Sequence, residues 1–105
     1  MSVHMKEDFE IPNKLMDIYR EMAVSPVGLL KNYALNLIYG KIHKYEVENI
    51  FFEKKYGQSF EAFKHKIESM EDEEHFEWED DLNDWEFVVE NLKYWKQKLD
   101  GLQSE

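Results

Sequence analysis

The chain contains no cysteine, only two prolines and only four glycines among its 105 residues. The absence of cysteine excludes a disulfide framework, a thiolate metal site and a cysteine nucleophile, and it agrees with a reducing cytosol. No Asn-Gly or Asp-Gly pair separates alternating apolar runs, so the usual sequence signal of a β-hairpin is missing. These absences argue against a disulfide-rich fold and against a fold built from hairpins.

Long apolar runs are missing as well. The first ten residues contain two Glu and one Asp and lack the apolar stretch that a secretory signal peptide requires. The longest apolar stretch, around Leu35–Tyr39, is far too short to span a bilayer. We therefore expect a soluble, cytoplasmic protein that does not associate with membranes.

Positive charge is scarce: 13 Lys and Arg stand against 23 Asp and Glu, which gives a formal net charge of −10. A nucleic-acid-binding face needs clustered basic residues, so we expect no direct binding to nucleic acid. The negative charge is also concentrated. Residues 67–92 hold 12 acidic residues and no Lys or Arg, whereas the rest of the chain holds 13 basic and 11 acidic residues, a net charge of +2.

Helical periodicity dominates what is present. It predicts a short helix over residues 12–23 and a long helix that starts at Ser25-Pro26 and ends at Tyr56, before a left-handed stop at Gly57. Apolar residues at alternating spacings of three and four form one face of the long helix, interrupted by Asn49: Leu35, Ile38, Ile42, Tyr45, Phe52 and Tyr56. Gly40 leaves open whether this helix is broken.

Two further helices are predicted after Gly57. The third begins at a capping Ser59 and carries Phe60, Phe63, Ile67 and Met70 on one side. The acidic run at residues 71–74 separates it from a final helix over about residues 78–99, which ends near Gly101. A heptad-like seam follows this helix, with a second stripe beside it: Trp78, Leu82, Trp85, Val89, Leu92 and Leu99, then Val88, Trp95 and Leu102.

These elements predict an all-α fold in one domain over residues 1–105, with residues 1–10 flexible. Two long helices with apolar seams favour an antiparallel helical hairpin or an open helical bundle. An isolated pair of such helices would leave its outer stripes exposed to water. We therefore expect the chain to form an oligomer or to bind a partner protein.

The residue patterns give little support for catalysis or a cofactor. His43 with Glu46, and Asp72 with His75, have the spacing that a di-metal bundle uses, but such spacings arise by chance among 23 acidic residues. An EF-hand that starts at Glu79 would place an aspartate where its loop needs glycine. A Gly-x-Ser-x-Gly elbow and a phosphate-binding loop are absent. We predict no enzyme activity, cofactor or metal, with a carboxylate–histidine metal-binding bundle as a distant alternative.

Carboxylates and aromatic residues alternate in the acidic window. Repulsion between like charges on adjacent helical turns costs a few tenths of a kcal/mol per pair, and a cationic partner would remove it. Tryptophan is a favoured anchor at interfaces. The predicted partner-binding residues are Phe76, Glu77, Trp78, Asp80, Asp81, Asp84 and Trp85. The same pattern equally fits a solvated acidic face beside a tryptophan core stripe, and both interpretations stay open at this stage.

Two segments, Ile50–Phe63 and Phe76–Phe87, resemble a group of small acidic proteins of archaea and bacteria. They contain a Phe-Glu-Lys-Lys-Tyr-Gly turn, a phenylalanine-containing helix and an acidic tryptophan helix, and the resemblance covers roughly residues 41–102. Proteins of this group resemble antitoxins, which are encoded beside a small toxin and neutralise it by direct binding. The positions that carry the resemblance are Glu53, Tyr56, Phe60, Phe63, Trp78, Asp80, Asp81 and Trp85.

The resemblance implies a non-enzymatic protein whose acidic helix covers a basic surface of a toxin, such as the RNA site of a ribonuclease-like toxin. One feature of many antitoxins is missing, because residues 1–23 contain three basic and five acidic residues and so do not form a basic DNA-binding segment. The alternative is a self-assembling helical protein whose seams pair with copies of itself.

Overall fold

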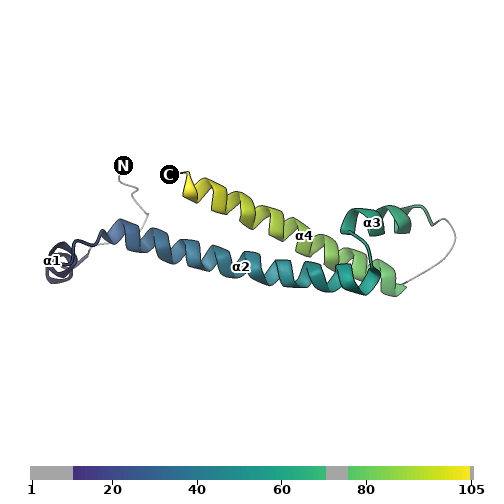
Figure 1. Cartoon of the computed structure of the whole chain (residues 1–105), viewed down its shortest axis with the longest axis horizontal. Coiled ribbons are helices and arrows are strands. Elements are labelled where there is room, and N and C mark those ends of the chain that lie inside the picture. The colour runs from purple at the N-terminus through teal and green to yellow at the C-terminus, as the bar shows by residue number, and fades with distance from the viewer. Residues whose placement is uncertain (1–10, 71–75, 105) are drawn as a thin grey trace. The chain divides into compact units, whose positions relative to one another are not determined.

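The computed structural model describes residues 11–70 and 76–104. These residues form four α-helices and no strand: α1 (Asn13–Glu21), α2 (Pro26–Tyr56), α3 (Phe60–Glu68) and α4 (Phe76–Gln103) (Figure 1). The prediction of an all-α fold is confirmed. The chain divides into two compact units, one up to Ala34 and one from Leu35 onward. The predictions of a flexible stretch at residues 1–10 and of an acidic separator at residues 71–74 fall outside the described residues.

Local chemistry fixes the two ends of α2. Pro26 occupies its first position, and the Ser25 hydroxyl accepts a hydrogen bond from the backbone N–H three residues later, at 3.2 Å. The helix then runs for 31 residues to Tyr56, so Gly40 does not break it. Gly57 follows with a φ of 64°, a left-handed conformation that ends a helix at little steric cost. Both predicted ends of the long helix are confirmed.

The next two helices differ in how well the sequence predicted them. Ser59 caps α3, because its hydroxyl accepts a hydrogen bond from the backbone N–H of Ala62 at 3.2 Å. In contrast, α4 begins two residues before Trp78 and continues through Gly101 to Gln103, so the predicted end near Gly101 holds only to within two residues. A glycine ends a helix when it takes a positive φ, and Gly101 does not do so.

Gly57 and Gly40 are expected to respond to alanine with opposite signs. Gly57→Ala places a Cβ on a left-handed residue and should lower the free energy of unfolding by about 1–2 kcal/mol. Gly40→Ala removes a flexible residue from a helix interior where an added Cβ meets no atom within 4 Å, and should raise that free energy by about 0.5–1 kcal/mol. Urea unfolding followed by circular dichroism measures both changes. A loss of stability in Gly40→Ala would contradict the continuous α2.

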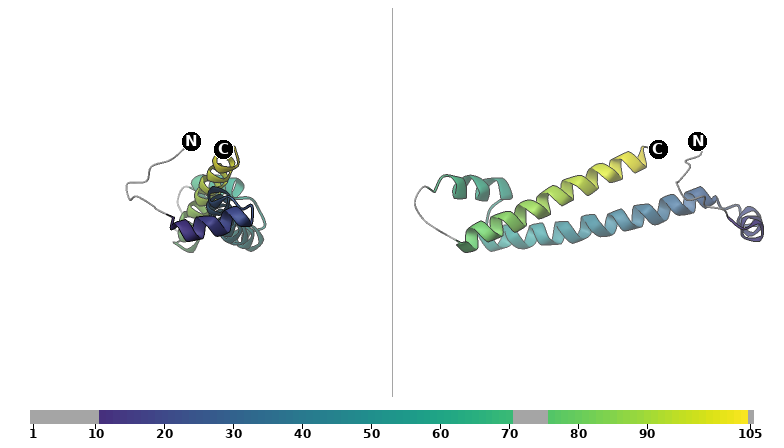
Figure 2. Two further views of the ribbon diagram at one scale, coloured as in Figure 1. Left: turned by 90° about the vertical axis from the view of Figure 1, so that its left-hand side faces the viewer. Right: turned by 180° about the vertical axis from the view of Figure 1, so that it is seen from behind.

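In the second unit, α4 runs antiparallel to the later part of α2. Asn49 contacts Trp85, while the earlier Tyr39 contacts the later Gln103, so the residue numbers of the two helices run in opposite directions. The short helix α3 packs against α4, and the two helices lie side by side both in Figure 1 and in the view from behind in Figure 2. The second unit is therefore held together by contacts that α4 makes with both α2 and α3.

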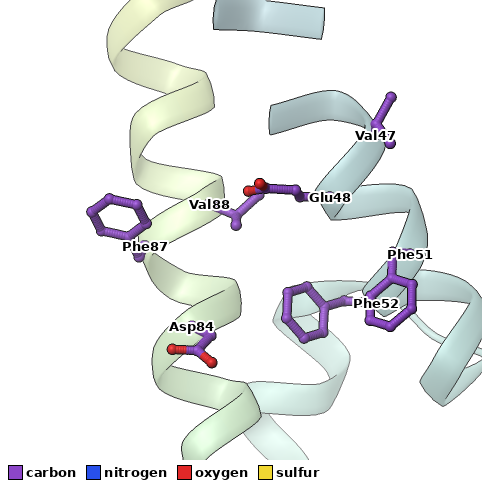
Figure 3. Close-up of a pocket in the computed structure, with 7 residues that line it drawn as sticks. All are labelled: Val47, Glu48, Phe51, Phe52, Asp84, Phe87 and Val88. Carbon is purple, nitrogen blue, oxygen red and sulfur yellow. The ribbon is translucent and has the colours of Figure 1, made fainter. Parts of the chain in front are cut away.

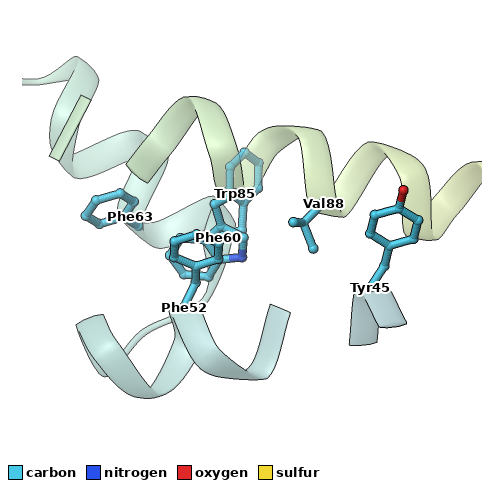
Figure 4. Close-up of a cluster of buried hydrophobic side chains, with 6 residues drawn as sticks. All are labelled: Tyr45, Phe52, Phe60, Phe63, Trp85 and Val88. Carbon is cyan, nitrogen blue, oxygen red and sulfur yellow. The ribbon is translucent and has the colours of Figure 1, made fainter. Parts of the chain in front are cut away.

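One aromatic cluster forms the core of the second unit (Figure 4). Its buried members come from α2, α3 and α4: Tyr45, Phe52, Phe60, Phe63, Trp85 and Val88. Trp85 is 0% exposed, stacks on Phe52 with ring centroids 5.5 Å apart, and meets Phe60 edge-on at 5.6 Å. Partly buried residues surround the cluster: Tyr56, Ile67, Trp78, Leu82, Val89, Leu92 and Trp95. The apolar faces predicted for these three helices are therefore largely the faces that pack.

Asn49, which interrupts the apolar face of α2, has a specific partner. Its side-chain carbonyl accepts a hydrogen bond at 2.7 Å from the indole N–H of Trp85. A buried indole needs such an acceptor, because an unpaired N–H inside a core costs free energy. The polar residue in the seam thus allows the tryptophan to be buried completely.

The first unit is packed much more loosely. None of its described residues, 11–34, is buried. Large apolar side chains on α1, on the start of α2 and between these helices are exposed: Leu15, Ile18, Met22, Val27, Leu29, Leu30 and Tyr33. The two helices leave a small pocket of about 180 Å³ between them. This unit therefore leaves several large apolar side chains exposed to solvent.

Candidate functional site

The seven predicted partner-binding residues lie in three different environments. Trp85 is completely buried, so it belongs to the core and cannot touch a partner in this conformation. This removes Trp85 from the candidate surface. Trp78 is partly buried against the core, and Asp81 is turned toward α2. The exposed members of the set are Phe76, Glu77, Asp80 and Asp84.

Asp81 anchors α4 to α2. Its carboxylate accepts a hydrogen bond from the Lys55 ammonium at 2.7 Å and another from the Tyr56 hydroxyl. Lys55 also lies 3.4 Å from the carboxylate of Glu77. Asp81 and Glu77 therefore already have cationic partners within the chain, and Asp81 is a structural contact.

The pKa values of this group reflect the same contacts. Burial raises the pKa of Asp81, but the hydrogen bonds from Lys55 and Tyr56 outweigh burial and lower it below its usual value. The hydrogen bond to Asp81 raises the pKa of Lys55. Burial and the hydrogen bond to Asp81 together raise the pKa of Tyr56 to about 12. The folded state thus favours an ionised carboxylate beside a protonated amine and a protonated phenol.

Stability should therefore fall at both extremes of pH. Because the pKa of Asp81 is lowered on folding, its contribution is present above its unfolded pKa of 3.8 and is lost as the pH falls through the folded value. Because the pKa of Tyr56 is raised, its contribution is present below pH 10 and is lost as the pH rises toward about 12. Urea midpoints measured across pH should show both declines.

Asp81→Asn should weaken the acid-side decline, because the substituted side chain does not titrate. Asp80→Asn is the matched control, since it removes an exposed carboxylate one residue away. If the urea midpoint of Asp81→Asn falls at low pH as much as that of the wild-type protein, the contact of Asp81 with Lys55 and Tyr56 does not contribute to stability as proposed.

A groove of about 500 Å³ opens between α2 and α4 (Figure 3). Its lining comes from both helices: Val47, Glu48, Phe51, Phe52, Asp84, Phe87 and Val88. Phe52 and Val88 are buried, whereas Val47, Phe51 and Phe87 are each more than half exposed. The groove is therefore apolar apart from two carboxylates.

These carboxylates, Glu48 and Asp84, have no ion-pair partner among residues 11–70 and 76–104. Figure 3 shows the Glu48 side chain extending from α2 toward α4. The groove thus places two negative charges beside exposed phenylalanine rings. A ligand that fits it needs an apolar group flanked by cations.

Of the seven residues that the sequence singled out, only Asp84 lines this groove. The groove residues on α2, namely Val47, Glu48 and Phe51, and also Phe87 on α4, were missed. The available signal was the pair Val47 and Phe51, which are four residues apart and lie outside the main apolar face of the long helix. Such a pair indicates a second apolar patch on the same helix.

The described part of the chain contains neither a cluster of metal-ligating side chains nor a membrane-spanning helix. There, no three His, Asp or Glu side chains lie close enough together to hold a metal ion. His43 and Glu46, the pair with metal-like spacing, are both exposed, and His75 lies outside the described residues. Across residues 11–70 and 76–104, no helix combines the length and apolar character needed to cross a membrane.

The groove and the acidic face of α4 must be interpreted from their own chemistry. No protein-family model, curated protein or solved structure matches this chain. The resemblance to antitoxin-like proteins therefore stays a prediction from the sequence. The groove is the structural feature on which a proposal about function can rest.

Proposed function

We propose that this chain is a non-enzymatic protein-binding domain that neutralises a basic partner protein, in the manner of an antitoxin. The partner binds in the groove between α2 and α4. The observation that carries the proposal is one groove that combines exposed Phe51 and Phe87 with Glu48 and Asp84, whose carboxylates have no ion-pair partner in the described part of the chain. An acidic surface alone would not distinguish a binding site from a solvated face.

The chemistry of the groove specifies the kind of partner. Exposed aromatic and aliphatic side chains gain free energy when a partner covers them, at about 25 cal/mol per Å² of apolar surface. Lysine or arginine beside that contact would pair with Glu48 and Asp84, and a charge-assisted hydrogen bond is stronger than a neutral one. An amphipathic helix with one apolar face and basic flanks has these features, and such helices dock into apolar grooves.

The other acidic residues of α4 also favour a basic partner protein. Glu79, Asp80 and Glu90 are exposed and have no cationic partner in the described part of the chain. Glu86, in contrast, lies 3.6 Å from Lys64. A surface that carries charge of one sign accelerates association with a partner of opposite charge and disfavours partners of the same charge.

The proposal also includes a cellular location and an arrangement of the helices. We place it in the cytoplasm, where an antitoxin meets its toxin, and regard α2 and α4 as a helical hairpin braced by α3. The contacts of Asn49 with Trp85 and of Tyr39 with Gln103 support the hairpin. Phe51 and Phe87 would lie on one face of it, available to the partner.

The experiment is co-expression with a short basic reading frame adjacent to the gene. The proposal predicts that this frame inhibits growth when expressed alone, that the present chain restores growth, and that the two proteins purify as a complex. The control is an unrelated helical protein of similar net charge. If growth stays inhibited and the two purified proteins do not bind, the proposal is wrong.

Self-assembly through the seam of α4 is the second candidate function. The burial of seam residues in the core of a single chain argues against it. Trp85 and Val88 lie on or beside that seam and are already buried against α2 and α3 within one chain. A seam that is used internally is not available to pair with another copy. The burial of these seam residues favours a different apolar surface for any self-association.

A further inference from the structure

We propose that two copies of this chain associate through the first unit, which joins α1 to the beginning of α2. This interface is separate from the groove, and its formation does not depend on the neutralising function. The proposed interface consists of the large exposed apolar side chains between residues 11 and 34: Leu15, Ile18, Met22, Val27, Leu29, Leu30 and Tyr33. The occupant of this surface is the same surface of a second copy.

The first reason is that the unit lacks a core of its own. Residues 11–34 include no buried side chain, although α1 and the start of α2 carry large apolar residues. Segments shorter than about 40 residues usually need disulfides, metals or association to become stable. The chain has no cysteine, so a disulfide cannot supply this stability.

The second reason is the size of the exposed surface. Seven large apolar side chains that are 40–74% exposed present on the order of 700 Å². A standard protein interface buries about 800 Å² on each partner. The surface of the first unit is therefore large enough for a specific dimer, and a two-fold axis lets one patch serve both copies.

The third reason is charge. Residues 11–34 contain three basic and two acidic residues, a net charge of +1, so two copies meet here with far less repulsion than the acidic α4 would cause. The pocket of about 180 Å³ between α1 and α2 is lined by Leu15, Tyr19, Leu30 and other apolar residues. It offers a hole for an apolar side chain of the second copy, as in knobs-into-holes packing.

Sedimentation equilibrium of the full chain tests this proposal. We expect a dimer that persists in 1 M salt, because apolar contacts are not screened. Leu30→Lys should raise the dimer dissociation constant at least ~10-fold. Ile50→Lys is the matched control, since Ile50 is 48% exposed against 56% for Leu30 but lies in the second unit. Circular dichroism should show that both variants keep their helix content.

Cross-linking gives an independent readout, because the chain has no native cysteine. With a bis-maleimide reagent, Tyr33→Cys should yield covalent dimers and Ile50→Cys should not. A monomer at all concentrations up to the millimolar range would overturn the proposal, as would equal weakening by Leu30→Lys and Ile50→Lys. Binding of a monomeric chain to phospholipid vesicles that Leu30→Lys abolishes would assign the surface to lipid and would also overturn it.

Discussion

Replacing Trp85 with alanine is expected to cause a large loss of stability in the second unit. Trp85 is 0% exposed, and it contacts aromatic residues on both other helices of the unit, including Phe52 and Phe63. Truncation of a buried Trp to Ala costs about 3–5 kcal/mol through lost contacts and the cavity left behind. The whole stability of a small domain is about 5–15 kcal/mol, so this loss is a large fraction of it and should lower the urea midpoint strongly.

A second variant separates the ring contacts from the hydrogen bond. Trp85→Phe keeps an aromatic ring but leaves the carbonyl of Asn49 without its donor. A buried acceptor left unpaired costs about 1–3 kcal/mol. The Asn49 amide also donates to Glu53 at 2.8 Å, so that contact should hold the side chain in place. We therefore expect Trp85→Phe to lie between the wild-type protein and Trp85→Ala.

Urea unfolding monitored by circular dichroism measures both effects. Phe76→Ala is the control, because Phe76 belongs to the same helix but is 69% exposed, and it should change the free energy of unfolding by less than about 0.5 kcal/mol. Equal losses in Trp85→Ala and Phe76→Ala would contradict the placement of Trp85 at the centre of the core.

The sequence predicted the helices well where their ends depend on local chemistry. The Ser25-Pro26 start, the Gly57 stop and the Ser59 cap each need only the residue itself and its nearest neighbours. Gly101 does not itself end α4, because a glycine can stay helical when nothing forces a positive φ. Local signals fix where a helix can stop but not whether it does so.

The candidate site was harder to predict, because it depends on how helices distant in sequence meet. The pattern could not distinguish the buried Trp85 from the exposed Phe76, although both lie in one acidic aromatic segment. It also could not reveal that Asp81 would pair with Lys55 of α2, 26 residues away. The groove needs Val47 and Phe51 beside Asp84, and only the antiparallel packing of α2 on α4 brings them together.

Charge reversal in the groove is expected to have the largest effect on partner binding. The double variant Glu48→Lys with Asp84→Lys replaces both carboxylates of the groove with cations, which would face the basic residues of the partner. Removing a well-placed ion pair costs about 2–5 kcal/mol, and like charges brought together add to this. We expect the dissociation constant for the co-purifying basic partner to rise at least ~100-fold by calorimetry. Phe87→Ser should raise it ~10-fold by removing an apolar contact.

The control for the double variant of the groove is a second double variant, Glu79→Lys with Asp80→Lys. This control makes the same change in net charge at exposed positions of α4 that do not line the groove. If the groove is the binding site, the control should mainly slow association and weaken binding much less, because rim charges act through long-range attraction that salt screens. If both double variants weaken binding equally, and if Phe87→Ser has no effect, the acidic helix attracts its partner as a diffuse charge. The phenylalanine-lined groove would then not be the site of contact.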